Sequence, residues 1–272
     1  MIQLKAVVFD WAGTMIDFGS RAPMGAFVEV FAEFGIEIST AEARGPMGMA
    51  KRDHIAQLLA LPRIAEAWER RHGHAPSDRD IDRVYTTFIP MNVAVAADHA
   101  ELIPGAVETI RFVRDRGMKI GSTTGYTREI MAPILPVAAA AGYRPDNVVC
   151  AGDLAEGRPS PLMMYRTLAD LGVYPPRAVV KVDDTAPGIA EGLAAGTWAV
   201  GVTASGNETG LSLADWTALD AVARRDAVSR ASTVLTQAGA HYLIDTIADL
   251  PAVIEAIDQR LKAGEQPPGG PL

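Results

Sequence analysis

Residues 6–14 read AVVFDWAGT, four apolar residues that end at Asp10 and are followed by a glycine-containing turn. An uninterrupted apolar run is typical of a parallel strand buried on both faces, because an exposed face would need alternating polar residues. Similar runs recur at 120–124, 148–150, 178–182 and 198–202. The segment therefore predicts the first strand of a parallel sheet, with Asp10 at its carboxyl end.

The stretches between these strands have a helical pattern. Val107, Ile110 and Val113 share one helix face, and charged residues fill the opposite face. Strands that alternate with amphipathic helices predict a doubly wound, Rossmann-like α/β fold. We expect this core to comprise residues 1–19 and 99–263.

Residues 20–98 lack a convincing strand and predict an all-helical cap inserted into the core. Phe27, Val30, Phe31 and Phe34 recur at the spacing of one helix face. Further helices are expected near 48–60, 62–72 and 78–89, with Pro62 and Pro90 at their edges. The tail, residues 264–272 (GEQPPGGPL), is expected to be disordered.

The composition describes a soluble globular protein and restricts its partners. The chain has 272 residues, 49% of them hydrophobic and 21% charged, with a net charge of −8. This acidic balance argues against nucleic acid as the main partner, because phosphate backbones select basic surfaces. The single cysteine, Cys150, fits a reducing cytoplasm, and neither a signal peptide nor a membrane span is expected.

Polar residues gather at the predicted carboxyl ends of the strands, where ligands bind in open parallel sheets. They are Asp10, Thr124, Asp153, Asp183 and Asp184. Converging carboxylates repel one another unless a hard cation lies among them, and magnesium is the usual partner of phosphoryl groups. The alternative for any single aspartate is that it caps the following helix. The set together predicts a Mg²⁺ site and phosphoryl chemistry.

Four segments in order resemble the motifs of the haloacid dehalogenase superfamily. They are FDWAGT at 9–14, KIGSTT at 119–124, GRPSP at 157–161 and DDT at 183–185. The resemblance implies that Asp10 is the nucleophile, that Thr124 and Arg158 bind the phosphoryl group, and that Asp184 holds the metal. For Arg158 the alternative is a surface ion pair. Asp183 binds the metal either directly or through a water; the motif leaves both open.

One departure from the superfamily pattern narrows the substrate. Most of its phosphatases carry a second aspartate two residues after the nucleophile, where this chain has Ala12. Ala12 can offer its backbone carbonyl to the metal, but it has no proton for a leaving alcohol. General acid catalysis of this kind is worth roughly 10²–10⁴-fold in rate. The broken bond is therefore expected not to be an ordinary phosphate ester.

The cap motif PMGMAKRDHI at 46–55, with TGYTR at 124–128 and GNETGL at 206–211, resembles the phosphonoacetaldehyde hydrolase family. The resemblance covers residues 7 to about 254. It implies that Lys51 forms a Schiff base with the substrate aldehyde and that His54, one helical turn away, shuttles protons. Without the resemblance, Lys51 would be expected at the surface, and His54 at the helix surface or in the core of the cap. The resemblance also places Met47, Gly48 and Tyr126 at the substrate, although Met47 and Tyr126 could instead pack. The implied reaction is hydrolysis of phosphonoacetaldehyde to acetaldehyde and phosphate through an aspartyl-phosphate on Asp10.

Two rival functions stay open on the sequence alone. A phosphate-ester phosphatase or phosphomutase would not need Lys51, but Ala12 argues against it. A binding module without catalysis would keep only the phosphate site, and the complete set of motifs argues against that. The resemblance also implies a homodimer joined through the caps. The face of Phe27, Phe31 and Phe34 is either that contact or the core of the cap.

Overall fold

The computed structural model describes residues 2–269, and its centre is a parallel sheet of six strands in the order β3-β2-β1-β4-β5-β6. The strands are β1 (Ala6–Phe9), β2 (Lys119–Thr124), β3 (Val149–Cys150), β4 (Val179–Asp183), β5 (Trp198–Val202) and β6 (Tyr242–Ile244). The first five confirm the strands expected from the apolar runs. Strand β6 was not predicted, because only three residues form it and two of them are half-buried.

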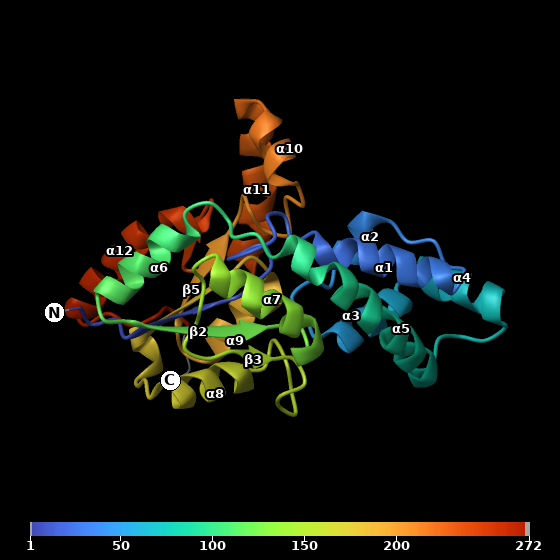
Figure 1. The fold of residues 1–272 in the computed structure, drawn as a ribbon, viewed down its shortest axis with the longest axis horizontal. Coiled ribbons are helices and arrows are strands. Elements are labelled where there is room, and N and C mark those ends of the chain that lie inside the picture. Colours follow the sequence, from blue (N-terminus) through green and yellow to red (C-terminus); the bar gives the residue numbers. More distant parts are fainter. Residues whose placement is uncertain (1, 270–272) are drawn as a thin grey trace.

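Helices cover both faces of the sheet, as the predicted α/β fold requires (Figure 1). They are α6 (Ala106–Asp115), α7 (Arg128–Ala140), α8 (Leu162–Leu171), α9 (Ala186–Ala194), α11 (Ala221–Gln237) and α12 (Leu250–Lys262). Val7 and Phe9 of β1 join the larger core cluster, whereas Ala6 and Val8 pack against residues of α8. Alternate residues of one strand thus face opposite helical layers, which is why the run is apolar throughout.

The insertion between β1 and β2 is helical over its described length. Its helices are α1 (Ala22–Glu33), α2 (Thr40–Arg44), α3 (Lys51–Ala60), α4 (Pro62–His72) and α5 (Asp78–Ala96). Figure 1 shows them beside the sheet, forming a cap at one edge. Pro62 begins α4 as expected, but Pro90 lies inside α5 rather than at its end. Phe88 and Asn92, on either side of Pro90, are buried, and this packing holds the helix together across the proline.

The predicted aromatic face belongs to the interior of the cap. Phe27 and Phe31 are fully buried, and Phe27 stacks on Phe88 with ring centroids 4.3 Å apart. Phe34 stacks on Trp68 of α4 at 5.8 Å. These side chains are therefore used within the chain, and the homodimer stays a prediction without this face as its contact.

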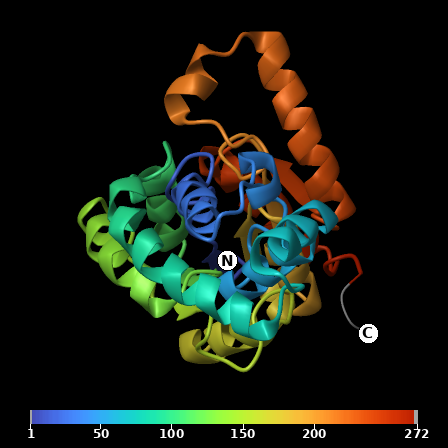
Figure 2. The ribbon, with the colours of Figure 1, turned by 90° about the vertical axis from the view of Figure 1, so that its right-hand side faces the viewer.

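Two further segments complete the described chain. The hairpin of α10 (Leu213–Ala218) and α11 projects from the core, as Figure 2 shows most clearly. Residues 264–269 of the tail, which we predicted to be disordered, follow a defined path in which Pro267 is buried and the Pro268 carbonyl contacts His241 Nε2 at 2.9 Å. Residues 270–272 lie outside the described residues. No helix within 2–269 is long and apolar enough to cross a bilayer.

Candidate active site

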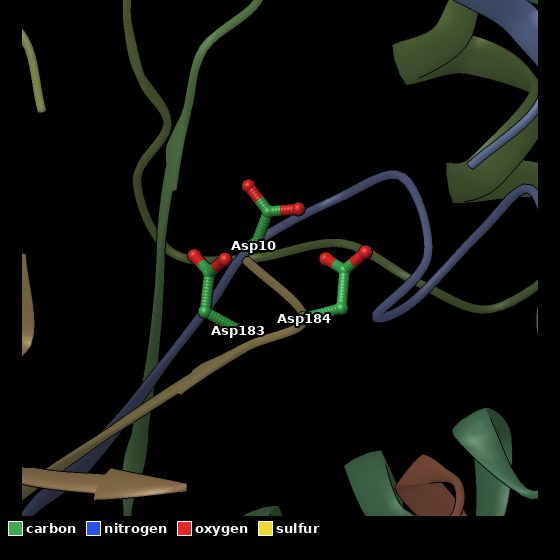
Figure 3. A group of neighbouring side chains, drawn as sticks. All are labelled: Asp10, Asp183 and Asp184. Carbon is green, nitrogen blue, oxygen red and sulfur yellow. The ribbon is translucent and has the colours of Figure 1, made fainter. Parts of the chain in front are cut away.

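Three carboxylates meet at the carboxyl end of the central strands. Asp10 follows β1, Asp183 is the last residue of β4, and Asp184 comes next. All three are buried, and each offers an oxygen within 4.8 Å of the others. Figure 3 shows the carboxylates pointing to the same side of the strand ends. The neighbouring parallel strands β1 and β4 thus bring together residues that are 173 positions apart.

Asp184 is fully buried, and its surroundings suit the binding of a cation. Its oxygens accept hydrogen bonds from Thr14 Oγ1 at 3.1 Å and from the Asn207 backbone N–H at 2.8 Å. Among residues 2–269, no lysine or arginine forms an ion pair with it. Burial, together with the carboxylates of Asp10 and Asp183, raises the pKa of Asp184 well above its ordinary value. An oxygen-only site with this excess of negative charge suits a hard divalent cation.

Asp183 differs from Asp184 because two cations already contact it. Its Oδ2 lies 3.2 Å from Arg158 Nη2 and 3.0 Å from Lys181 Nζ. Its Oδ1 accepts hydrogen bonds from the Thr185 hydroxyl at 2.7 Å and the Thr185 N–H at 3.0 Å. Burial alone would raise the pKa of Asp183, but the two cations hold it below its ordinary value.

Arg158 is a buried member of the site and not a surface ion pair. Only 3% of the residue is exposed. Its Nη2 donates to Asp10 Oδ1 at 2.8 Å and to the Thr123 carbonyl at 2.7 Å. Asp10 nevertheless has a pKa raised to about 6, because burial and the Asp183 charge outweigh Arg158. The guanidinium therefore supplies fixed positive charge beside the predicted nucleophile.

A small, partly open cavity of about 20 Å³ brings most of the predicted residues together. Its lining contains eight of them: Asp10, Ala12, Met47, Gly48, Lys51, Thr124, Tyr126 and Arg158. Ser20, Gly125 and Thr185 line it as well and were not predicted. Asp153 lies elsewhere, since its carboxylate binds Arg128 and the Cys150 N–H, so its inclusion among the converging residues was wrong.

Lys51 reaches this cavity from the first position of α3. The residue is 2% exposed, and its Nζ lies 3.9 Å from Met47 Sδ and 4.9 Å from the centre of the Tyr126 ring. No carboxylate among the described residues forms an ion pair with it. Burial lowers the pKa of Lys51 to about 8, and Asp10 opposes that shift only in part. Roughly one molecule in ten then carries the neutral, nucleophilic amine at pH 7.

His54 lies behind Lys51 in the cap and does not line the cavity. Its Nε2–H donates to the Ala43 carbonyl at 2.8 Å, which leaves the Nδ1 lone pair without a partner among residues 2–269. The ring stacks on Phe27 at 4.0 Å. Burial and the nearby Lys51 charge lower the pKa of His54 to about 3. The imidazole is therefore neutral at physiological pH and can accept a proton at Nδ1.

Comparison with known proteins identifies the family. Residues 4–196 match the family described as haloacid dehalogenase-like hydrolases. The phosphonoacetaldehyde hydrolase of Paraburkholderia xenovorans is 57% identical over 270 residues, which cover 98% of this chain and 100% of the relative. That of Vibrio cholerae is 50% identical over 266 residues, covering 97% and 98%. The chain belongs to the phosphonoacetaldehyde hydrolase family.

Solved structures agree with this membership. A phosphonoacetaldehyde hydrolase like protein from Oleispira antarctica has a TM-score of 0.96 and 45% identity, covering 97% of this chain and 96% of that one. A β-phosphoglucomutase from Clostridium difficile, at 17% identity and a TM-score of 0.68, covers 96% and 99% and shares the fold alone.

In this phosphonoacetaldehyde hydrolase family member, glycines let the cap approach the core closely. A side chain at Gly48 would overlap Thr185 Oγ1, and a Cβ at Gly125 would lie 2.6 Å from the Met49 carbonyl oxygen. Arg44, the last residue of α2, donates to the Gly19 carbonyl at 3.0 Å, to Asn207 O and Oδ1 at 3.0 and 3.1 Å, and to the Gly210 carbonyl at 3.2 Å. The cap is thus held closed over the strand ends.

Several residues that surround the site belong to none of the motifs. Arg44 gave no signal, because its acceptors are mainly backbone carbonyls that only the folded loops bring together. Lys181 did give a signal: a lysine inside the apolar strand VVKVD needs buried partners. Glu191 on α9 is one of them, and the two charges lie 3.3 Å apart.

Proposed function

We propose that the chain hydrolyses the carbon–phosphorus bond of phosphonoacetaldehyde, giving acetaldehyde and phosphate, and that Mg²⁺ is its metal. The observation that carries the proposal is the buried amine of Lys51 in the same cavity as Asp10. A phosphate-ester phosphatase has no use for such an amine. The names of the close relatives support the same substrate.

Lys51 is the residue that makes cleavage to carbon feasible. Direct departure of carbon from phosphorus would leave a carbanion. Attack of the neutral amine on the aldehyde, with uptake of one proton and loss of water, gives a protonated imine, which accepts the bonding electrons and becomes an enamine. His54 supports this step as a proton relay, since its unpartnered Nδ1 lies one helical turn from Lys51 and its low pKa keeps the imidazole neutral.

Asp10 is the proposed nucleophile at phosphorus. Its attack breaks the bond to carbon and forms an aspartyl-phosphate, which water then hydrolyses. Arg158 allows two anions to approach, because its guanidinium contacts Asp10 and faces the cavity. Mg²⁺ held by Asp10, Asp184 and the Ala12 carbonyl, with Asp183 beside them, would supply further charge neutralisation at the phosphoryl oxygens.

Ala12 is consistent with this chemistry. The departing enamine takes its proton at carbon, and hydrolysis of the imine then releases acetaldehyde and restores the Lys51 amine. No group at position 12 has to protonate a leaving oxygen. The proposed reaction therefore does not need an acidic side chain in place of the half-buried Ala12.

Replacement of Lys51 by arginine tests the proposal. The guanidinium keeps the charge but cannot form a stable imine, so phosphate release from phosphonoacetaldehyde should cease. Borohydride added with substrate should label Lys51 in the native protein and nothing at this position in the variant. Lys119→Arg, at an exposed position, is the matched control. Full turnover by Lys51→Arg, or rapid turnover of phosphate esters by it, would refute the proposal in favour of a phosphatase.

A further inference from the structure

A buried charge pair lies directly beneath the catalytic residues. Lys181, in the middle of β4, and Glu191, in α9, are both 0% exposed. Neither lines the cavity described above. The fold makes room for the lysine, because a Cβ at Gly192 would lie 2.7 Å from Lys181 Cβ. Burying two charged side chains costs free energy, so each must form ion pairs and hydrogen bonds inside the protein.

One carboxylate oxygen of Glu191 gathers three donors. Its Oε2 accepts from Arg158 Nε at 3.0 Å and from the Thr123 hydroxyl at 2.8 Å. Lys181 Nζ lies 3.3 Å from the same oxygen. The lysine also donates to Thr123 Oγ1 at 2.7 Å and pairs with Asp183 at 3.0 Å. Arg158 also pairs with Asp10 and Asp183, so two cations meet three carboxylates around Thr123.

This network uses the inner edges of the Arg158 guanidinium. Glu191 occupies Nε, while Asp10 and Thr123 occupy Nη2. The remaining nitrogen, Nη1, has a single long contact of 3.5 Å with the Gly48 carbonyl of the cap. Because a guanidinium is planar, fixing Nε and Nη2 also fixes the direction of Nη1. Nη1 is therefore the donor left for a phosphoryl oxygen.

We propose that Glu191, supported by Lys181, is a positioning residue that orients Arg158 toward the phosphoryl group. The anion that Arg158 meets rests on the proposed function, but the orientation itself does not depend on which bond is broken. Glu191 acts through Arg158 and not on the substrate. Its removal should weaken oxyanion binding without removing a ligand of the metal.

The test measures binding of inorganic phosphate and of Mg²⁺ by calorimetry, without turnover. In Glu191→Gln the charged acceptor of Arg158 Nε is lost, and phosphate affinity should fall about 10- to 100-fold. Mg²⁺ affinity should change less than about threefold, because Asp10 and Asp184 keep their places. Asp258→Asn is the matched control, since this buried carboxylate binds the backbone of Gln3 and Leu4 at the opposite end of β1.

A double variant separates positioning from charge balance. Lys181→Met with Glu191→Gln removes both buried charges, so the unfolding temperature should recover relative to Glu191→Gln alone. Phosphate affinity should stay low, because the charged acceptor of Arg158 Nε is still missing. If Glu191→Gln does not fold, the double variant carries the comparison with the native protein. Native phosphate affinity in either variant would overturn the proposal, whereas loss of acetaldehyde production alone would bear only on the proposed function.

Discussion

The carboxylate of Asp183 fills the space beside Gly188, so that any side chain at position 188 would overlap it. The two residues lie on either side of the turn from β4 into α9. Asp183 reaches its partners Arg158 and Lys181 only because position 188 lacks a Cβ. The acidic motif of this chain therefore depends on a glycine as well as on its two aspartates.

Gly188→Ala should displace Asp183. Overpacking of this kind costs about 1–3 kcal/mol, so urea denaturation should show a lower free energy of unfolding. The Mg²⁺ concentration for half-maximal phosphate release should also rise. Gly25→Ala serves as control, because a Cβ there meets nothing within 4 Å and the substitution favours helix α1. Equal behaviour of the two variants would contradict the role assigned to Gly188.

Lys51→Met should stabilise the protein at neutral pH. The pKa of Lys51 falls from 10.5 to about 8 on folding because of burial, so folding disfavours the charged form. The unfolded chain binds more protons between pH 8 and 10.5, and native stability therefore rises with pH over that window. The variant should gain about 3 kcal/mol at pH 7 and progressively less toward pH 10.5. Denaturation at pH 7 and pH 10 measures this, with the exposed Lys119→Met as control.

His54→Gln should slow imine formation. Glutamine can still donate to the Ala43 carbonyl, but it lacks the basic nitrogen that Nδ1 provides. Loss of general base catalysis predicts a decrease of roughly 10²–10⁴-fold in the rate of borohydride labelling of Lys51. Because the pKa of His54 is about 3, the native pH profile should bend near pH 8, where Lys51 titrates, and not near pH 6.5. An unchanged labelling rate would remove His54 from the mechanism.

Metal removal should separate the two halves of the reaction. If Asp10, Asp183 and Asp184 surround Mg²⁺ as we propose, EDTA should remove it and phosphate release should stop. Lys51 lies on the cap and forms no ion pair with these groups within residues 2–269. Acetaldehyde and borohydride should therefore still label it. Added Mg²⁺ should restore phosphate release, and continued release in EDTA would exclude a metal requirement.

Arg44→Lys should weaken closure of the cap. Lysine keeps the charge but cannot reach the carbonyls of Gly19, Asn207 and Gly210 together. Loss of one hydrogen bond to a charged group predicts a rise in KM of about tenfold or more. Small-angle scattering should show a more extended molecule. Arg63→Lys, whose ion pair with Glu42 lies within the cap and is exposed, should leave both measurements near native.

The sheet could be predicted because most of its strands are recognisable one by one in the sequence. Each of the first five is an apolar run, and parallel pairing brings their carboxyl ends to one edge. Strand β6 has no such signal, since His241 and Asp245 flank only three residues. The predicted end of α5 near Pro90 was wrong, because helix propensity takes no account of the buried neighbours of Pro90.

Site residues that belong to a motif could be predicted. Residues that reach the site only through packing between elements could not. Asp10, Lys51 and Arg158 line one cavity, as the motifs implied. Lys181 lies within an apolar strand and therefore needs a buried partner. That partner, Glu191, is ten residues further along the chain, on a helix. Only the crossing of β4 and α9 shows that the two charges meet. Pairwise contacts between elements are the information that a pattern along one chain lacks.

The location of Lys51 on the cap and of Asp10 on the sheet has an evolutionary consequence. If these residues act as we propose, phosphorus chemistry resides in the sheet, whereas the choice of bond resides in an inserted segment. New reactivity could then arise by remodelling residues 20–98 while the inherited acidic edge stays unchanged. The insertion would then determine which bond is broken, and the parallel sheet would supply the residues that act on phosphorus.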